Sequence, residues 1–272
     1  MLKDVTFGQY FPGDSVVHKM DPRMKLVLII VYIVMLFVAD GIIPLLLGVA
    51  VTVFAYAMSK LSFKLVWRSV KPILPIVVFT AILNIFFIEG DPLFQWKFIT
   101  ISERGVVTAV LMCVRIISLI AGSSLLTYTT TPIALTDGLE RLMKPLEKIK
   151  VPVHELSMMM TIAFRFIPTL IDETGKIIAA QKARGADMDS GNAIQKAKAL
   201  VPILIPLFVS AFRRADELAL AMECRCYRGG EGRTRLKQLS LSGRDWAAAA
   251  LMTAALAGVI LLNKFGPAVM VL

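Results

Sequence analysis

The sequence predicts an all-α membrane protein with about five transmembrane helices and a cytoplasmic helical domain that contains two long helices. Three observations support this fold class. Of the 272 residues, 57% are hydrophobic, a larger share than ordinary soluble domains contain. Five apolar windows approach the length of about 20 residues that a helix needs to cross a bilayer. Between the fourth and fifth windows, the sequence changes to charged segments with apolar residues at helical spacing.

The five apolar windows are the expected membrane spans: residues 24–39, 42–58, 72–88, 105–126 and 246–262. Only Asp40 and Gly41 separate the first two, which predicts a tight helical hairpin. Basic residues gather before the first span and after the second, so both of these segments are expected in the cytoplasm. The chain then divides into a cytoplasmic N-terminal segment, four spans, a cytoplasmic domain and a C-terminal span: residues 1–23, 24–128, 129–245 and 246–272.

Three helices are expected in the domain at residues 129–245. The first begins where Thr131 suits the N-cap position and Pro132 the first turn, and it extends to Lys150. An amphipathic helix lying on the membrane fits the same segment. The two long helices follow at about residues 154–183 and 192–227, and both contain proline within an apolar stretch. Pro168 is predicted to kink the first of them.

The end of the first long helix carries Ala183, Arg184 and Gly185. Glycine readily takes the left-handed conformation that closes a helix, and this would present the arginine at an exposed tip. The planar guanidinium is suited to carboxylates on a partner. The alternative is that this arginine only complements the helix dipole.

The end of the second long helix carries Arg225 between Cys224 and Cys226. Cysteine lacks the conformational freedom of glycine, so this helix is also compatible with a later end at Gly229. The similarity of the two ends favours a shared binding role over two coincidental basic residues.

Several function classes are disfavoured by the composition. The formal net charge is +10, but the basic residues lie between apolar runs, a pattern that indicates membrane topology and not nucleic-acid binding. The three cysteines, Cys113, Cys224 and Cys226, lack metal-site spacing, and no cofactor is expected. The N-terminus has no apolar core and cleavage site of a secretory signal peptide.

Enzymatic activity is also disfavoured. The pair His154-Glu155 begins like the zinc-protease pattern H-E-x-x-H, but Met158 stands at its last position. The sequence contains no G-x-x-x-x-G-K-[ST] phosphate loop, so nothing in it indicates that the chain binds or hydrolyses ATP by itself. An ordinary ABC permease that binds its own substrate, and a membrane enzyme, remain as alternatives.

A further signature precedes the first span: Gly8-Gln9-Tyr10, Pro12-Gly13-Asp14-Ser15, His18, Asp21-Pro22-Arg23 and Lys25. With this signature and the two arginine ends, essentially the whole chain resembles the transmembrane T component of energy-coupling factor (ECF) transporters. These are ATP-driven importers of vitamins and transition-metal ions.

The resemblance implies a non-enzymatic coupling subunit at the cell membrane. Arg184 and Arg225, with their neighbours, would each dock on one of two ATP-binding cassette ATPase subunits. A membrane-embedded substrate-binding (S) subunit, one or several interchangeable ones, would supply the vitamin. A dedicated component of a cobalt or nickel importer is the nearest alternative.

Two further features have open interpretations. The apolar residues of the first long helix either form an adaptable surface for S subunits or pack against neighbouring helices: Met158, Met159, Met160, Phe164 and Phe166. Arg115 lies inside the fourth expected span, where a charge is costly. It is expected to contact a partner protein or a polar neighbour such as Asn84.

Overall fold

The computed structural model describes residues 10–88, 92–96, 99–186, 192–229 and 239–265. It divides into two compact units, one formed by residues 8–139 and 238–272 and the other mainly by residues 140–237. The expected residues Gly8 and Gln9 of the N-terminal signature lie outside the described part.

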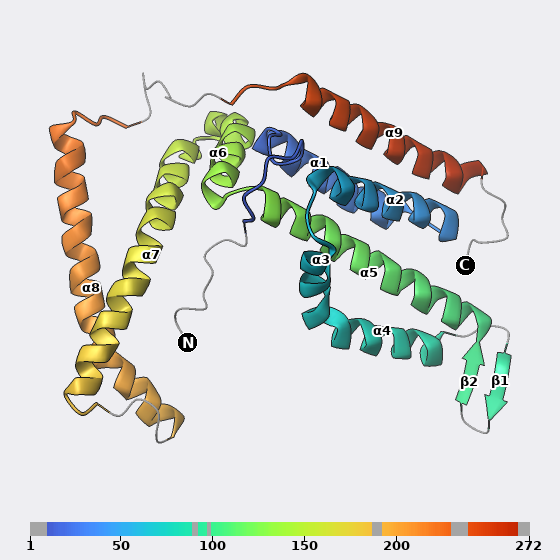
Figure 1. The fold of residues 1–272 in the computed structure, drawn as a ribbon, viewed down its shortest axis with the longest axis horizontal. Helices are drawn as coiled ribbons and strands as arrows, with labels where there is room; N and C mark the ends of the chain where they lie inside the picture. Colours follow the sequence, from blue (N-terminus) through green and yellow to red (C-terminus); the bar gives the residue numbers. More distant parts are fainter. Residues whose placement is uncertain (1–9, 89–91, 97–98, 187–191, 230–238, 266–272) are drawn as a thin grey trace. The chain divides into compact units, whose positions relative to one another are not determined.

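Four helices of the first unit pack around a shared apolar core (Figure 1): α1 (Pro22–Val38), α2 (Ile42–Ser59), α5 (Glu103–Thr129) and α9 (Gly243–Phe265). The core is made by Tyr32, Met35, Leu36, Ala39, Leu45 and Val259. Gly122 allows α5 to approach α1 closely, since a Cβ atom there would lie 2.3 Å from Cε1 of Tyr32. The hairpin of α1 and α2 is confirmed, and Gly41 has φ 108° at the start of α2.

The segment between α2 and α5 is more divided than expected. It contains α3 (Phe63–Val70), a 3₁₀ turn (Lys71–Ile73) and α4 (Leu74–Phe87), which packs on α5. An antiparallel pair of strands follows, β1 (Pro92–Trp96) and β2 (Ile99–Ser102). Neither α3 nor the strands were anticipated, because the sequence between the spans was interpreted only through its charge.

Four helical stretches in the described part are long and apolar enough to cross a membrane: residues 42–59, 64–87, 103–129 and 243–264. The helix α1 has 17 residues. This is a length of about 25 Å, at the lower limit for a span. The prediction of an α-helical membrane protein with about five spans is confirmed.

The second unit is dominated by α7 (Val153–Ala183) and α8 (Ala193–Cys224), which pack against each other (Figure 1). Both expected long helices are therefore confirmed. Each remains α-helical through its internal prolines. Figure 1 shows that α8 changes direction in its first half, which contains both of its prolines.

The helix expected from Thr131 to Lys150 is correct at its start only. The Ala134 amide donates to Oγ1 of Thr131 at 3.3 Å, which confirms the N-cap, and Pro132 is the first residue of α6 (Pro132–Met143). The α-helix then gives way to a 3₁₀ helix (Lys144–Ile149), whose second residue is Pro145. Proline removes a backbone donor and crowds the preceding turn, which accounts for the early end of α6.

Candidate functional site

The arginine end of α7 is a Schellman C-cap. Arg184 occupies the cap position, and Gly185 follows with φ 86°. The Gly185 amide donates to the Lys182 carbonyl at 3.0 Å, and the Ala186 amide donates to the Gln181 carbonyl at 3.0 Å. These two hydrogen bonds define the motif, and they require a left-handed residue after the cap.

The arginine end of α8 has the same geometry. Arg225 is the cap residue, and Cys226 takes the left-handed conformation with φ 55°. The Cys226 amide donates to the Glu223 carbonyl at 2.8 Å, and the Tyr227 amide donates to the Met222 carbonyl at 3.1 Å. The possible later end at Gly229 is therefore wrong. The two hydrogen bonds impose on Cys226 the conformation that glycine adopts in the first motif.

Both tips are open to solvent. Arg184 and Arg225 are exposed, together with Ala183 and Cys224 before them and the left-handed residues after them. A Cβ atom added at Gly185 would meet no atom within 4 Å. Neither guanidinium forms an ion pair or hydrogen bond with a residue that the structure describes. Each tip thus presents a cation whose donors are available to a partner.

The two tips lie at opposite ends of one helix pair. Near the end of α7, Nε2 of Gln181 donates to the Pro202 carbonyl of α8 at 3.3 Å. Just beyond the end of α8, the Tyr227 hydroxyl donates to Sδ of Met158 near the start of α7, at 3.1 Å. The helices therefore run in opposite directions, and their arginines are separated along the pair.

A polar contact joins the two helices between the tips. Glu173 of α7 accepts hydrogen bonds from the Ser210 hydroxyl and from Nη2 of Arg214, the latter at 3.0 Å. The Ser210 hydrogen bond and the Arg214 charge hold the pKa of Glu173 below its ordinary value of 4.5. This contact fixes the packing of α7 on α8 at one point along their length.

Apolar surface surrounds this contact. A groove of about 610 Å³ lies between α7 and α8, with Phe166 and Arg214 among its lining residues. The sequence left open whether the apolar residues of α7 are exposed or packed, and both outcomes occur. Met159 and Met160 are exposed, whereas Met158, Phe164 and Phe166 are partly buried.

The N-terminal signature is held together by its own side chains. Nδ1 of His18 lies 2.6 Å from Oγ of Ser15, and its Nε2 lies 3.0 Å from the Phe11 carbonyl. A Cβ atom at Gly13 would lie 2.9 Å from the His18 ring, so glycine permits this close approach. The Phe11 amide donates to the Tyr128 carbonyl at 2.9 Å, which attaches the segment to the end of α5.

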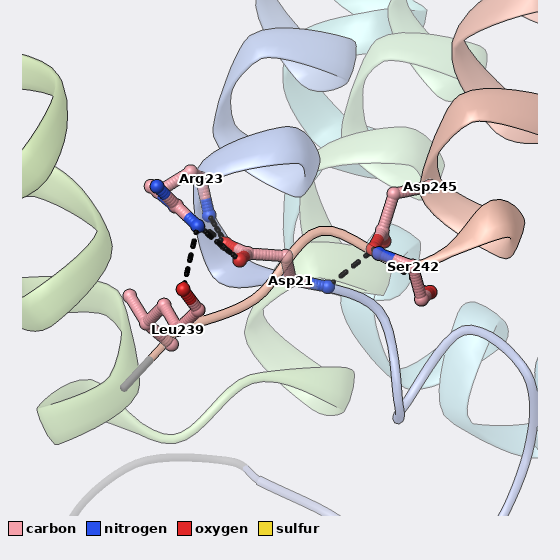
Figure 2. A network of polar contacts seen from close by, with 5 residues as sticks. All are labelled: Asp21, Arg23, Leu239, Ser242 and Asp245. Carbon is pink, nitrogen blue, oxygen red and sulfur yellow. Dashed lines mark hydrogen bonds and ion pairs between the residues drawn. The ribbon is translucent and has the colours of Figure 1, made fainter. Parts of the chain in front are cut away.

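The signature residues at the start of α1 also contact α9 (Figure 2). Asp21 caps α1 and binds Arg23 through a 2.8 Å ion pair to Nη2, and the same Nη2 donates to the Leu239 carbonyl. The Asp21 amide donates to Oδ1 of Asp245 at 3.0 Å. Oδ2 of Asp245 accepts from the amide and hydroxyl of Ser242. This network joins segments 224 positions apart in the sequence.

Arg115 has a different partner from the one expected. Its Nη2 donates to the Ala39 carbonyl at the end of α1, at 2.6 Å, whereas Nδ2 of Asn84 donates to the Thr80 carbonyl. The expectation of Asn84 as the neighbour is wrong. A cation at a helix C-terminus is favoured by the helix dipole, which accounts for this placement.

Sequence reasoning missed the roles of Ser242 and Asp245. At the start of α9, Asp245 accepts hydrogen bonds from the Ser242 amide at 2.8 Å and from the Ser242 hydroxyl at 3.0 Å. The S-x-x-D pattern before an apolar run was the available signal. Within the described residues, no group of histidine, cysteine or acidic side chains is arranged to hold a metal ion.

Comparison with known proteins identifies the family. Residues 13–236 match the CbiQ family, described as cobalt transport protein. The energy-coupling factor transporter transmembrane protein EcfT of Clostridium kluyveri is 57% identical over 250 residues, which cover 91% of this chain and 93% of that protein. The protein of the same name from Ruminiclostridium cellulolyticum is 53% identical over 266 residues, covering 97% and 98%. That from Bacillus subtilis is 46% identical over 246 residues, covering 90% and 93%. The chain belongs to the CbiQ family and is a transmembrane component of the EcfT type of energy-coupling factor transporters.

Proposed function

We propose that this chain is the non-enzymatic coupling subunit of an ATP-driven ECF importer, in which Arg184 and Arg225 each bind one of two ATP-binding cassette ATPase subunits. One observation carries this proposal. Both arginines occupy the cap position of the same Schellman motif, and both are exposed. Two equivalent cationic tips suit two equivalent acidic grooves, because a guanidinium binds carboxylates through paired hydrogen bonds.

The helix pair supplies the mechanical link. When the ATPase subunits approach each other on binding ATP, the tips of α7 and α8 move with them. Long helices transmit such motion as rigid levers. The hydrogen bonds that Glu173 accepts from Ser210 and Arg214 keep the two levers in contact, so movement of one tip changes the position of both helices.

The apolar face of α8 is the surface that we assign to the membrane-embedded S subunit. It carries large exposed side chains at helical spacing: Val201, Leu204, Ile205, Phe208, Val209 and Phe212. Exposed apolar residues gathered in this way mark interaction surfaces. Met159 and Met160 of α7 add flexible side chains that adapt to different partners. This suits a subunit that serves several interchangeable S subunits for vitamins.

The proposed orientation places the N-terminus and the unit of α7 and α8 in the cytoplasm. The basic residues before the first span and after the second favour this orientation. It also brings the two tips to the side where ATP is available. A dedicated component of a cobalt or nickel importer is the second candidate, and the description of the matching family as cobalt transport protein favours it.

The test is copurification of the two ATPase subunits with this chain in detergent. Arg184→Ala and Arg225→Ala are each expected to reduce the recovery of ATPase subunits, and the double variant to abolish it. Arg213→Ala is the matched control, because Arg213 is an exposed arginine in the middle of α8. Recovery that is equal in the double variant and in the control would refute the docking role.

A further inference from the structure

An apolar groove opens on the first unit between α1, α2, α5 and α9. Its volume is about 440 Å³. Ligand clefts typically measure about 300–1,000 Å³. The small side chains of Ala55, Ala247 and Ala248 leave room for it among larger apolar residues. Phe54, which lines the groove, is half exposed, so the groove is accessible from outside the helices.

The floor of the groove presents no polar group that needs a ligand. The Tyr32 hydroxyl donates to the Ser118 carbonyl at 2.9 Å, and the Thr52 hydroxyl donates to the Gly48 carbonyl at 3.0 Å. Both hydroxyls are therefore occupied within the protein. A hydrocarbon chain suits this lining better than a polar substrate, because a polar group would lose its hydration without gaining partners.

One end of the groove is cationic. Lys25 and Arg244 both line it. Nζ of Lys25 donates to the Thr129 carbonyl at 2.9 Å and to Oγ1 of Thr130 at 3.1 Å, so its hydrogen-bond partners there are uncharged. Arg244 is exposed and has no ion pair among the described residues. Its guanidinium is available to an anion at the mouth of the groove.

The neighbouring acidic groups do not neutralise this end. Asp21 is paired with Arg23, and the carboxylate of Asp245 already accepts hydrogen bonds from Asp21 and Ser242. Counting the acids Asp21 and Asp245 against the bases Arg23, Lys25 and Arg244 leaves one net positive charge.

The groove is slightly shorter than one membrane leaflet. From Lys25 to Tyr32 along α1, and from Arg244 to Met252 along α9, the lined length is about 10–12 Å. This is shorter than one leaflet of a hydrocarbon core about 30 Å thick. Trp246 lies next to the cationic end and is 65% exposed. Tryptophan is enriched at the membrane interface, which places this end at the level of the lipid headgroups.

We propose that this groove binds an anionic phospholipid, with the phosphate on Arg244 and an acyl chain between α1, α2, α5 and α9. Charge complementarity selects an anionic headgroup, and the apolar lining selects its hydrocarbon chain. This role is independent of the proposed ATPase docking. With the orientation proposed above, the cationic end of the groove lies in the cytoplasmic leaflet, and this placement alone rests on the proposed function.

The headgroup contact is tested by native mass spectrometry of the purified chain with phosphatidylglycerol or phosphatidylcholine. One phosphatidylglycerol is expected to be retained in preference to phosphatidylcholine. Arg244→Gln should weaken this retention about five-fold, the typical effect of one basic residue near a membrane surface. Arg244→Lys should largely restore the retention. Arg104→Gln should leave it unchanged, because Arg104 is an exposed residue at the start of α5, whereas the groove is lined by the C-terminal part of that helix. Equal retention in Arg244→Gln and Arg104→Gln would overturn the headgroup assignment.

The acyl-chain contact is tested by filling the groove. Ala247 lines the groove and is exposed, so Ala247→Phe should block lipid entry without disturbing the core. Ala250 is exposed on the same helix and does not line the groove, which makes Ala250→Phe the matched control. Retention of phosphatidylglycerol should fall in the first variant only. If Ala247→Phe instead releases a copurifying membrane subunit and leaves lipid retention intact, the groove is a protein contact and the proposal is wrong.

Discussion

Replacing Asp245 with alanine should destabilise the membrane unit substantially. Asp245 is 1% exposed. Its carboxylate accepts three hydrogen bonds: from the Asp21 amide at 3.0 Å, the Ser242 amide at 2.8 Å and the Ser242 hydroxyl at 3.0 Å. The substitution removes the side-chain acceptor of Ser242 at the start of α9 and the link between α9 and the start of α1. Hydrogen bonds to a charged group contribute about 1.5–3 kcal/mol, so we expect a loss of about 2–4 kcal/mol in the free energy of unfolding.

The assay is thermal unfolding in one detergent, followed by intrinsic fluorescence. For a chain of this size, the expected loss corresponds to a fall in Tm of about 4–7 °C. Asp14→Ala is the control, because the Asp14 side chain is 96% exposed and its 3.3 Å ion pair with Lys19 lies at the surface. Such a pair contributes less than about 1 kcal/mol. If Asp245→Ala lowers Tm no more than Asp14→Ala does, the buried network does not hold α9 to α1.

Two further predictions concern the helix pair. The folded-state pKa of Glu173 is lowered by Ser210 and Arg214, so its contribution to stability is present above the unfolded pKa and is lost as the pH falls below about 4.5. The difference in Tm between the wild type and Glu173→Gln should therefore stay constant above about pH 5 and shrink as the pH is lowered towards about 3, and a constant difference over this lower range would contradict the assigned contact. Cys226 has φ 55°, a left-handed conformation that costs a non-glycine residue about 1–2 kcal/mol. Cys226→Gly removes this cost and stabilises the helix end, so amide hydrogen exchange in the last turn of α8 should become about five-fold slower or more. Gly185→Ala should accelerate exchange in the last turn of α7, and unchanged rates in both variants would show that the caps do not control these ends.

The main elements could be predicted from the sequence because their signals are local. Apolar windows of sufficient length predicted the spans, and Thr131 with Pro132 predicted the start of α6. The 3₁₀ helix at Lys144–Ile149 was missed, although Pro145 indicates that the α-helix ends before it. The strand pair β1 and β2 was also missed, because strands this short give a weak periodicity.

The parts that could not be predicted depend on contacts between distant residues. The approach of Asp245 to Asp21, and the choice of the Ala39 carbonyl by Arg115, follow from the packing of helices far apart in the sequence. The arginine tips were located correctly from Ala183-Arg184-Gly185 and Cys224-Arg225-Cys226. The left-handed conformation of Cys226 was not predictable, because cysteine adopts it only under the constraint of the Schellman hydrogen bonds.

The central claim is that each arginine tip touches an ATPase subunit, and cross-linking from the tips tests it most directly. Cys226 is exposed beside Arg225 and provides a native attachment point. In the first variant, Cys113 and Cys224 are changed to serine, and Cys226 remains as the single cysteine. In two further variants, all three native cysteines are changed to serine, and the single cysteine is Ala183→Cys or the exposed mid-helix control Arg213→Cys. A thiol-specific cross-linker should capture an ATPase subunit from both tips in the assembled transporter, and not from the control. Capture of ATPase subunits from the middle of α8, with none from either tip, would contradict the account.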